Sequence, residues 1–143
     1  MDARLPLYRL DHAQTYLVAW EGGEPLGHAH VAWQATTLGV PEIQDVFVPE
    51  ELRGQGIGTA LSRAAEQLAQ ERGHGRISIS ASITNDGALQ LYRRLGYREA
   101  PLPPQQVQGT ILIRGLPVQV DDTLVYLVKD LGLEHAPDLQ RAP

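Results

Sequence analysis

The sequence contains no cysteine, and this absence excludes several kinds of chemistry. Without thiols the chain can form no disulfide, no thiolate metal site and no covalent intermediate on a cysteine nucleophile. Long apolar runs are also missing, because no stretch approaches the length of a transmembrane helix and residues 1–4 lead into mixed sequence rather than a signal-type segment. We therefore expect a cytoplasmic protein with neither a membrane partner nor a metal cofactor.

Basic residues are scarce relative to acidic ones. The chain has 12 Lys and Arg against 17 Asp and Glu, a net charge of −5. Nucleic-acid-binding proteins usually carry a basic surplus, so we expect no nucleic-acid partner, and the balance is compatible with a cationic or amine substrate. With 143 residues, of which 43% are hydrophobic, residues 1–143 are predicted to form a single domain with a real core.

The spacing of hydrophobic residues predicts a mixed α/β fold. Residues 15–20 and 26–34 are expected to form a β-hairpin around a turn at 21–25. The strands predicted at 42–48 and 76–82 enclose a helix over 59–72, which makes a strand–helix–strand crossover. The helix over 59–72 is expected to bury a face made of Leu61, Ala64, Ala65 and Leu68. A second helix is expected to have an apolar face made of Ala88, Leu91, Tyr92 and Leu95. A loop is predicted at 101–109, followed by strands at 110–114, 117–120 and 123–129.

Three glycines, Gly54, Gly56 and Gly58, alternate directly before the first predicted helix. A helix N-terminus carries unpaired N–H groups and the positive end of the helix dipole, and bare glycines let a phosphate approach them. The alternative is a turn that merely needs unusual backbone angles. A Walker loop would need a lysine after its glycines, and none is present. A dinucleotide-binding fingerprint would need a G-x-G-x-x-G spacing after the first strand, and this spacing is also missing.

The pattern R-x-x-G-x-G at 53–58 resembles that of the GNAT superfamily of acyl-CoA N-acyltransferases. VFVPEELRGQGIGTAL at 46–61 is similar to the family's strand, loop and long helix. NDGA at 85–88 and LYRRLGY at 91–97 resemble its asparagine turn and helix end. The resemblance covers 42–98 strongly and the hairpin loosely. It implies an α/β fold with a splayed central mixed sheet flanked by helices, acetyl-CoA as co-substrate, and transfer of the acetyl group to a primary amine by direct attack.

The resemblance also assigns residues to the coenzyme. It implies that backbone N–H groups from Gln55 to Thr59 hold the pyrophosphate, while the main chain over Val46–Val48 pairs with the pantetheine amides like an added strand. Asn85 would bind the pantetheine arm, cap the following helix, or do both. The full set implied to contact coenzyme A is Val46, Phe47, Val48, Arg53, Gly54, Gln55, Gly56, Ile57, Gly58, Thr59, Asn85 and Tyr92.

Acetyl transfer to an amine requires a group that removes the amine proton and one that protonates the leaving thiolate. Glu42, at an offset where some family members carry a base, is the candidate base, and a solvated residue at a strand start is the alternative. Strand alternation predicts that Glu42, Gln44, Val46 and Val48 share one face and that Asp45 lies on the other.

Tyr92 is the candidate acid. It matches the family tyrosine that faces the coenzyme sulfur, and a phenol with a pKa of about 10 stays protonated at neutral pH. A plain core role within its helical stripe is the alternative. Ser80 stands where some N-terminal-amine acetyltransferases carry a glutamate. His28 and His30 are expected to share one side of their strand as ordinary residues.

Two further sequence features bear on partners. Arg93 and Arg94 are expected on a solvated helix face, with a contact to the 3′-phosphate of coenzyme A as the alternative. Family members usually carry one or two helices between their first and second strands, and these helices wall the acceptor pocket. About a dozen residues precede the strand predicted at 15–20, too few for both helices, so we expect the N-terminal helices to be shortened or absent. We therefore expect an acceptor side that is open, or completed by 107–129 or by a second subunit in a homodimer. The acceptor would be a small-molecule or peptide amine, and a non-catalytic acyl-CoA-binding module of the same fold is the alternative.

Overall fold

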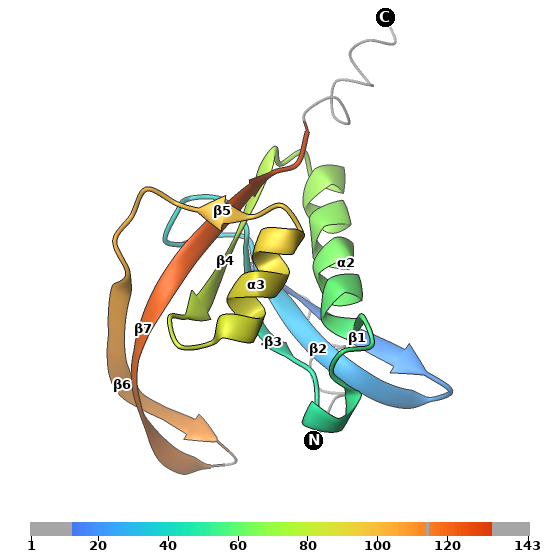
Figure 1. Cartoon of the computed structure of the whole chain (residues 1–143), viewed down its shortest axis with the longest axis horizontal. Helices are drawn as coiled ribbons and strands as arrows, with labels where there is room; N and C mark the ends of the chain where they lie inside the picture. Colours follow the sequence, from blue (N-terminus) through green and yellow to red (C-terminus); the bar gives the residue numbers. More distant parts are fainter. Residues whose placement is uncertain (1–12, 114, 133–143) are drawn as a thin grey trace, which may run out of the picture.

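The computed structural model describes residues 13–113 and 115–132, which form one twisted sheet with helices packed against it (Figure 1). The strands follow the order β1-β2-β3-β4-β7-β5, and β6 pairs with β7 outside this path. β3 and β4 run parallel, and the other neighbours pair antiparallel. The strands are β1 (Gln14–Glu21), β2 (Glu24–Ala32), β3 (Glu42–Phe47), β4 (Arg76–Ser82), β5 (Arg98–Glu99), β6 (Gln105–Ile113) and β7 (Leu116–Asp130). The predicted mixed α/β fold with its hairpin and crossover is confirmed.

The helices α2 (Ile57–Glu71) and α3 (Asp86–Arg94) lie on the same face of the sheet, and a short 3-10 helix, η1 (Glu50–Leu52), follows β3 (Figure 1). Strand alternation explains why one face is apolar. In β4 the side chains of Ile77, Ile79 and Ala81 belong to the core that the helices cover, whereas the serines between them point to the opposite face. The sheet therefore has one apolar, helix-covered face and one polar face.

Several predicted boundaries are wrong. The expected loop at 101–109 is half strand, because β6 begins at Gln105, and the strands expected at 117–120 and 123–129 are one continuous strand, β7. The two-residue strand β5 was not predicted, and it pairs with the same long strand. These features depend on pairing with β7, which local sequence patterns do not encode.

The buried face of α2 also differs from the predicted one. Leu61 and Ala65 are buried as expected, but Ala64 is exposed and the polar residues Ser62 and Glu66 are buried instead. The helix begins two residues earlier than predicted, with Ile57 buried in its first turn. A periodicity that counts only apolar residues misses buried polar groups whose hydrogen bonds are supplied by other elements.

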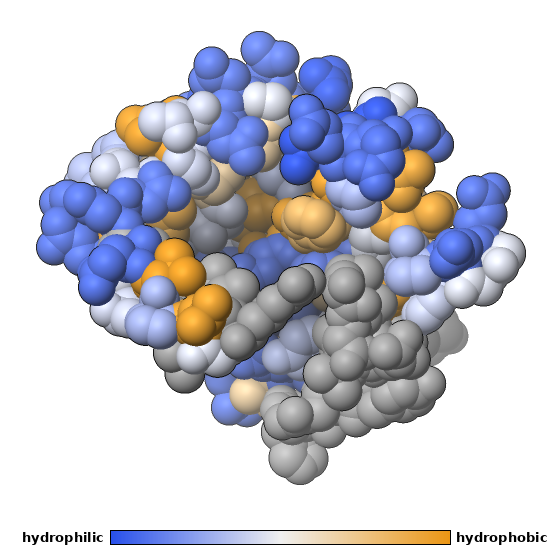
Figure 2. Space-filling view, turned by 90° about the horizontal axis from the view of Figure 1, so that it is seen from below, coloured by the Kyte–Doolittle hydropathy of each residue, from blue (hydrophilic) through white to orange (hydrophobic). Residues whose placement is uncertain are grey.

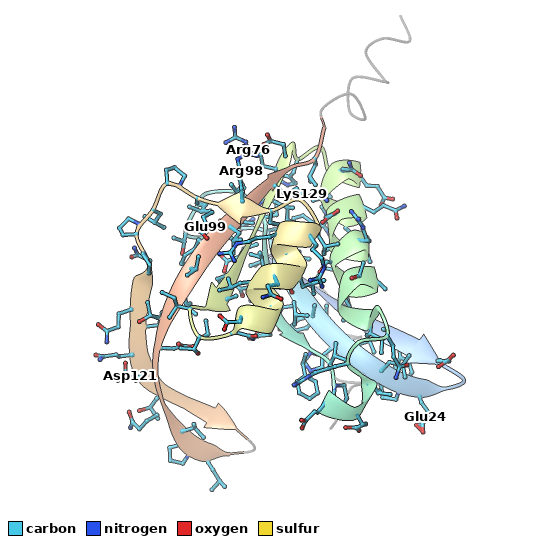
Figure 3. All side chains as sticks on the ribbon, in the orientation of Figure 1. Glu24, Arg76, Arg98, Glu99, Asp121 and Lys129 are labelled. Atoms are coloured by element: carbon cyan, nitrogen blue, oxygen red, sulfur yellow. The ribbon has the colours of Figure 1, made fainter. Side chains whose placement is uncertain are left out.

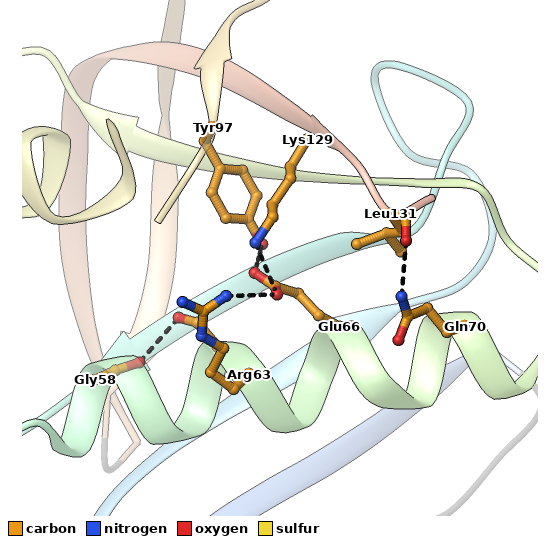
Figure 4. A network of polar contacts seen from close by, with 8 residues as sticks. Gly58, Arg63, Glu66, Gln70, Tyr97, Lys129 and Leu131 are labelled. Carbon is orange, nitrogen blue, oxygen red and sulfur yellow. Dashed lines mark hydrogen bonds and ion pairs between the residues drawn. The ribbon is translucent and has the colours of Figure 1, made fainter. Parts of the chain in front are cut away.

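Glu66 is the centre of a buried polar network that joins α2 to the sheet (Figure 4). Its Oε2 accepts a hydrogen bond of 2.8 Å from the Tyr97 hydroxyl, and its Oε1 lies 3.0 Å from Lys129 Nζ on β7. Arg63, one turn earlier on α2, lies 3.4 Å from the same Oε1. Burial and the adjacent carboxylate both raise the pKa of Tyr97, so its hydroxyl stays a donor. The network fixes α2 against β7 at the end of the helix remote from the glycines.

Within the described residues, β3 and β4 pair only at Glu42–Ser78 and Ile43–Ile79. Beyond these two pairs the parallel strands separate, and β4 continues in register with β7 up to Ser82–Leu124. The predicted splay of the central sheet is thus confirmed. It leaves backbone groups of β3 on the β4 side without a strand partner, where another extended group can pair with them.

Arg76 and Arg98 lie close together at one end of β4, β7 and β5, where both reach Asp130 (Figure 3). Asp121 lies on the hairpin of β6 and β7, which extends away from the rest of the sheet (Figures 1 and 3). Neither helix within 13–113 and 115–132 has the length and apolar character needed to cross a membrane. Within these ranges no three His, Asp or Glu side chains lie close enough together to hold a metal ion.

Candidate functional site

A cavity of about 630 Å³ lies where β3 separates from β4, between the first turn of α2 and one side of α3. Seen from below Figure 1, the molecule is hollowed, with hydrophobic side chains in the hollow and hydrophilic ones around it (Figure 2). Eleven of the residues predicted to contact the coenzyme line this cavity: Val46, Phe47, Val48, Arg53, Gly54, Gly56, Ile57, Gly58, Thr59, Asn85 and Tyr92. The lining includes neither Gln55 nor Glu42. Tertiary folding therefore gathers three separate stretches of sequence around one space.

The glycine loop forms the N-terminus of α2, and its backbone is left-handed. Gly54 and Gly56 have φ angles of 83° and 84°, which L-residues with a side chain rarely adopt. A Cβ atom added at either position would meet nothing within 4 Å, so the loop surface is bare. Gly58 does not share this conformation, and a Cβ atom there would lie 3.4 Å from the Leu91 side chain. The glycines are thus needed for two reasons. Gly54 and Gly56 provide the left-handed backbone angle, and Gly58 allows α3 to approach closely.

The N–H groups at this helix end are available. Ala60 N–H donates to the Gly56 carbonyl over 2.9 Å, which is the first bond inside α2. The N–H groups of Ile57, Gly58 and Thr59 precede it and have no acceptor within the helix. Gly56 is the N-cap residue, and no side chain caps the helix. Together with the helix dipole these donors make a positive site for an anion at the cavity wall.

Arg53 connects this loop to the end of β3. Its side-chain Nε donates to the Val48 carbonyl over 2.9 Å. The bond holds the loop beside Val46–Val48, whose backbone lies past the last β3–β4 pair. The guanidinium, which is exposed, therefore acts as a clamp between two cavity walls rather than pointing into the core.

Tyr92 lines the cavity from α3 and is only 3% exposed. Burial raises the pKa of its phenol above the usual value, and a hydrogen bond with Ser62 counteracts part of that rise. Ser62 is fully buried, and its hydroxyl donates to the Gly58 carbonyl over 2.9 Å. The hydroxyl of Tyr92 is thus linked to the first turn of α2 and stays protonated at neutral pH, where it can donate a proton.

At the start of α3, the Asn85 side-chain Oδ1 accepts a hydrogen bond of 3.1 Å from Ala88 N–H. The capping role considered for Asn85 is confirmed, and the residue also lines the cavity. The two arginines at the end of α3 differ. Arg94 lines the cavity, whereas Arg93 forms an ion pair with Glu99 on β5.

The predicted face of β3 is wrong, because a β-bulge interrupts the strand. His28 pairs with Phe47 and His30 with Gln44, so β3 has one residue more than β2 between these pairs. Asp45 takes a φ of 55° at this point. Val46 and Val48 consequently pack against the helix-side core.

Glu42 precedes the bulge and lies on the polar face of the sheet, where the bulge also brings Asp45. Asp45, expected on the opposite face from Glu42, lies beside His30, with 3.3 Å between Asp45 Oδ2 and His30 Nδ1. Glu42 is 4% exposed, so the reading as a solvated strand-start residue is wrong. Its Oε2 accepts hydrogen bonds from Ser80 Oγ at 3.1 Å and Gln44 Nε2 at 3.2 Å.

Sequence reasoning missed several residues of the site. Leu52, Gly87, Ala88 and Leu91 also line the cavity. The apolar stripe of α3 did contain Ala88 and Leu91, but the stripe alone did not show that part of it faces a cavity rather than the core. Ser62 gave no signal at all, since a serine inside a predicted helix usually faces solvent.

The comparisons with known proteins agree with this geometry. The sequence pattern of the acetyltransferase (GNAT) family matches residues 1–97, which is more than half of the chain, and the chain therefore belongs to this family. Streptothricin acetyltransferase from Streptomyces lavendulae is 33% identical over 98 residues, covering 68% of this chain and 51% of that protein. The match spans about a quarter to a half of the length of the first curated relatives.

Solved structures share the fold. Nourseothricin acetyltransferase superposes with a TM-score of 0.66 at 26% identity, covering 85% of this chain and 68% of that one. A streptothricin acetyltransferase described from Bacillus anthracis in complex with acetyl coenzyme A superposes with a TM-score of 0.64 at 20% identity, covering 86% of this chain and 65% of that one. At that identity the second likeness shows the fold alone.

Proposed function

We propose that this protein transfers the acetyl group of acetyl-CoA to a primary amine by direct attack within a ternary complex. The observation that carries the proposal is the cavity itself. A bare, positive helix end lies at one wall, strand backbone without a partner forms the second, and a buried phenol lies on the third. These are a diphosphate site, a site for an extended amide chain, and a proton donor, and acetyl-CoA presents the matching groups.

Each wall has a role in binding. The N–H groups from Gln55 to Thr59 hold the pyrophosphate, and Arg94 approaches the negatively charged nucleotide end. The main chain of Val46–Val48 pairs with the pantetheine amides as an added strand would, which the separation of β3 from β4 permits. Asn85 caps α3 and borders the same arm.

The chemistry needs a new bond from nitrogen to the acetyl carbon and loss of the carbon–sulfur bond. The Glu42 carboxylate accepts a proton from the ammonium group of the substrate, directly or through water, and the neutral amine then attacks the acetyl carbon. Backbone N–H near Phe47 stabilises the oxyanion. The phenol of Tyr92 donates its proton to the departing thiolate and regains one from solvent. Because the chain has no cysteine, the acetyl group passes to the amine without an acyl-cysteine intermediate.

The names of the relatives support amines as the acceptor class, and streptothricin belongs in any panel of candidates. The hairpin of β1 and β2 turns through Gly22 and Gly23 alone, so this connection adds no wall to the acceptor side. This observation favours a second candidate, a non-catalytic acyl-CoA-binding module of the same fold. The buried phenol in the cavity favours the enzyme.

Release of free thiol from acetyl-CoA distinguishes the two candidates. We expect thiol to appear with at least one member of a panel of spermidine, lysine, streptothricin and a peptide with a free N-terminus, with equimolar acetylated amine found by mass spectrometry. Binding of coenzyme A without thiol release from any amine would favour the module. Coenzyme A at a hundred times its Kd should stabilise the fold by about 2.7 kcal/mol, and no rise in Tm would contradict both candidates.

A further inference from the structure

On the polar face of the sheet, a continuous series of polar contacts leads from the surface to Glu42. Asp45, whose side chain is 75% exposed, faces His30 Nδ1 at 3.3 Å. The other ring nitrogen, Nε2, lies 2.8 Å from Gln44 Oε1. The amide nitrogen of Gln44 donates to Glu42 Oε2 over 3.2 Å. Every link joins side chains of β2 and β3 at the bulge.

The direction of each donor follows from the Glu42 carboxylate. Glu42 accepts hydrogen bonds only, so the Gln44 NH₂ group must face it and the Gln44 carbonyl must face His30. His30 Nε2 therefore carries a hydrogen. Asp45 Oδ2 lies beside the other ring nitrogen, Nδ1, at the exposed end of these contacts.

The groups around His30 come from three strands. The rings of His30 and Tyr16 on β1 have a centroid distance of 5.1 Å, and Asp45, Gln44 and Glu42 come from β3. His28 lies two residues away on β2, where burial lowers its pKa, Asp45 raises it and His30 lowers it. His30 itself is 8% exposed.

Resting on the proposed role of Glu42 as base, we propose that His30 and Gln44 are positioning residues that orient the Glu42 carboxylate. His30 Nε2 donates to the amide oxygen of Gln44, and the amide nitrogen of Gln44 donates to Glu42 Oε2 together with Ser80. With both donors on Oε2, the second oxygen, Oε1, is left to accept the proton of the amine or of a bridging water. The bulge at Asp45 is what brings the anchoring carboxylate to this side of the sheet.

The hydrogen bond from His30 to Gln44 can be tested without any assay of activity. Long-range proton–nitrogen NMR spectra of the full chain report which ring nitrogen carries hydrogen. We expect hydrogen on His30 Nε2, which lies 2.8 Å from Gln44 Oε1. An Nε2 without hydrogen would overturn the proposal even in a fully active enzyme.

The coupling to Glu42 is tested by the pH profile of kcat/KM with acetyl-CoA and the panel amine that gives the fastest thiol release. Gln44→Met removes a donor to the Glu42 carboxylate, and His30→Leu removes the group that orients this donor. Each change is an effect of roughly tenfold, so the acid limb should move up by about one pH unit. The matched controls are Gln67→Met on the exposed side of α2 and His74→Leu, which stacks on Trp33, and both should leave the limb in place.

The two kinds of failure are distinguishable. If the acid limbs of folded Gln44→Met and His30→Leu coincide with the wild-type limb, the positioning role of His30 and Gln44 is overturned, while acetyl transfer itself is left intact. Absence of thiol release by the wild type with any panel amine contradicts the proposed function instead. In that case the NMR signal of His30 Nε2 alone decides whether His30 donates to Gln44.

Discussion

The helix end at Gly56 permits a sharp test of anion binding, because this residue can be changed without removing any N–H donor. Gly56 has a φ of 84°, and a side chain there extends into open space on the cavity side. Gly56→Ala introduces the backbone strain alone, about 1–2 kcal/mol. Gly56→Asp introduces the same strain and a negative charge where the diphosphate is proposed to lie. The difference in coenzyme A affinity between the two variants therefore isolates the electrostatic contribution to binding.

The size of the electrostatic effect of Gly56→Asp on coenzyme A binding follows from Coulomb's law. Two unit charges about 4 Å apart at a protein surface interact by about 4 kcal/mol, and salt and solvent reduce this further. A residual of about 2–3 kcal/mol against the diphosphate corresponds to a Kd roughly 30- to 150-fold weaker for Gly56→Asp than for Gly56→Ala. The gap should narrow as ionic strength rises, since exposed charges are screened.

Isothermal titration calorimetry with coenzyme A measures the effect, and the chain supplies a matched control. Gly73 has the same φ of 84°, also has open space at its Cβ position, and lies just past the other end of α2. Gly73→Ala and Gly73→Asp should bind coenzyme A with equal affinity. Each variant is first checked by its Tm, so that lost binding is not confused with unfolding.

The reasoning would be refuted if folded Gly56→Asp and Gly56→Ala bound coenzyme A equally well at low salt. Such a result would mean that the anion does not lie at the N-terminus of α2, and the glycines would then serve only the backbone turn.

Further predictions concern buried groups on α2 and α3. Tyr92→Phe should lower kcat at least tenfold while the Kd for coenzyme A changes little, and turnover equal to wild type would remove the phenol from the mechanism. Glu66→Ala leaves Lys129 and Tyr97 without their partner and should lower the free energy of unfolding by about 3 kcal/mol, which lowers Tm by roughly 10 °C. The control Glu71→Ala, on the exposed side of α2, should change Tm by less than about 2 °C. The pKa values of Tyr92 and Tyr97 are raised in the folded state. Above the unfolded-state pKa of about 10, the unfolded chain therefore loses protons that the native state keeps. The free energy of unfolding should then fall with rising pH by about 1.4 kcal/mol per pH unit for each tyrosine. Denaturant titrations at pH 9 and 11 check this, and Tyr97→Phe should show a smaller loss than wild type.

Local patterns in the sequence were enough for the order of the main elements and for the helix N-terminus at the glycines. The hairpin, the strand at 76–82 and both helices follow from alternation and helical periodicity, and these patterns need no knowledge of partners. The motif at 53–58 also marked most of the cavity lining, because the loop is short and its geometry depends on glycines that the sequence displays directly.

Only the tertiary structure decided which side chains meet across the sheet. The bulge at Asp45 arises from the pairing of β3 with β2, and it reverses the faces of the residues that follow, so alternation along the sequence gave the wrong neighbours for Glu42. The contacts of Glu42 with Ser80 and of Tyr92 with Ser62 join residues 38 and 30 positions apart, and no local pattern connects them. Periodicity along one strand or helix reports which residues share a face, whereas the chemistry of a site depends on which faces the fold brings together.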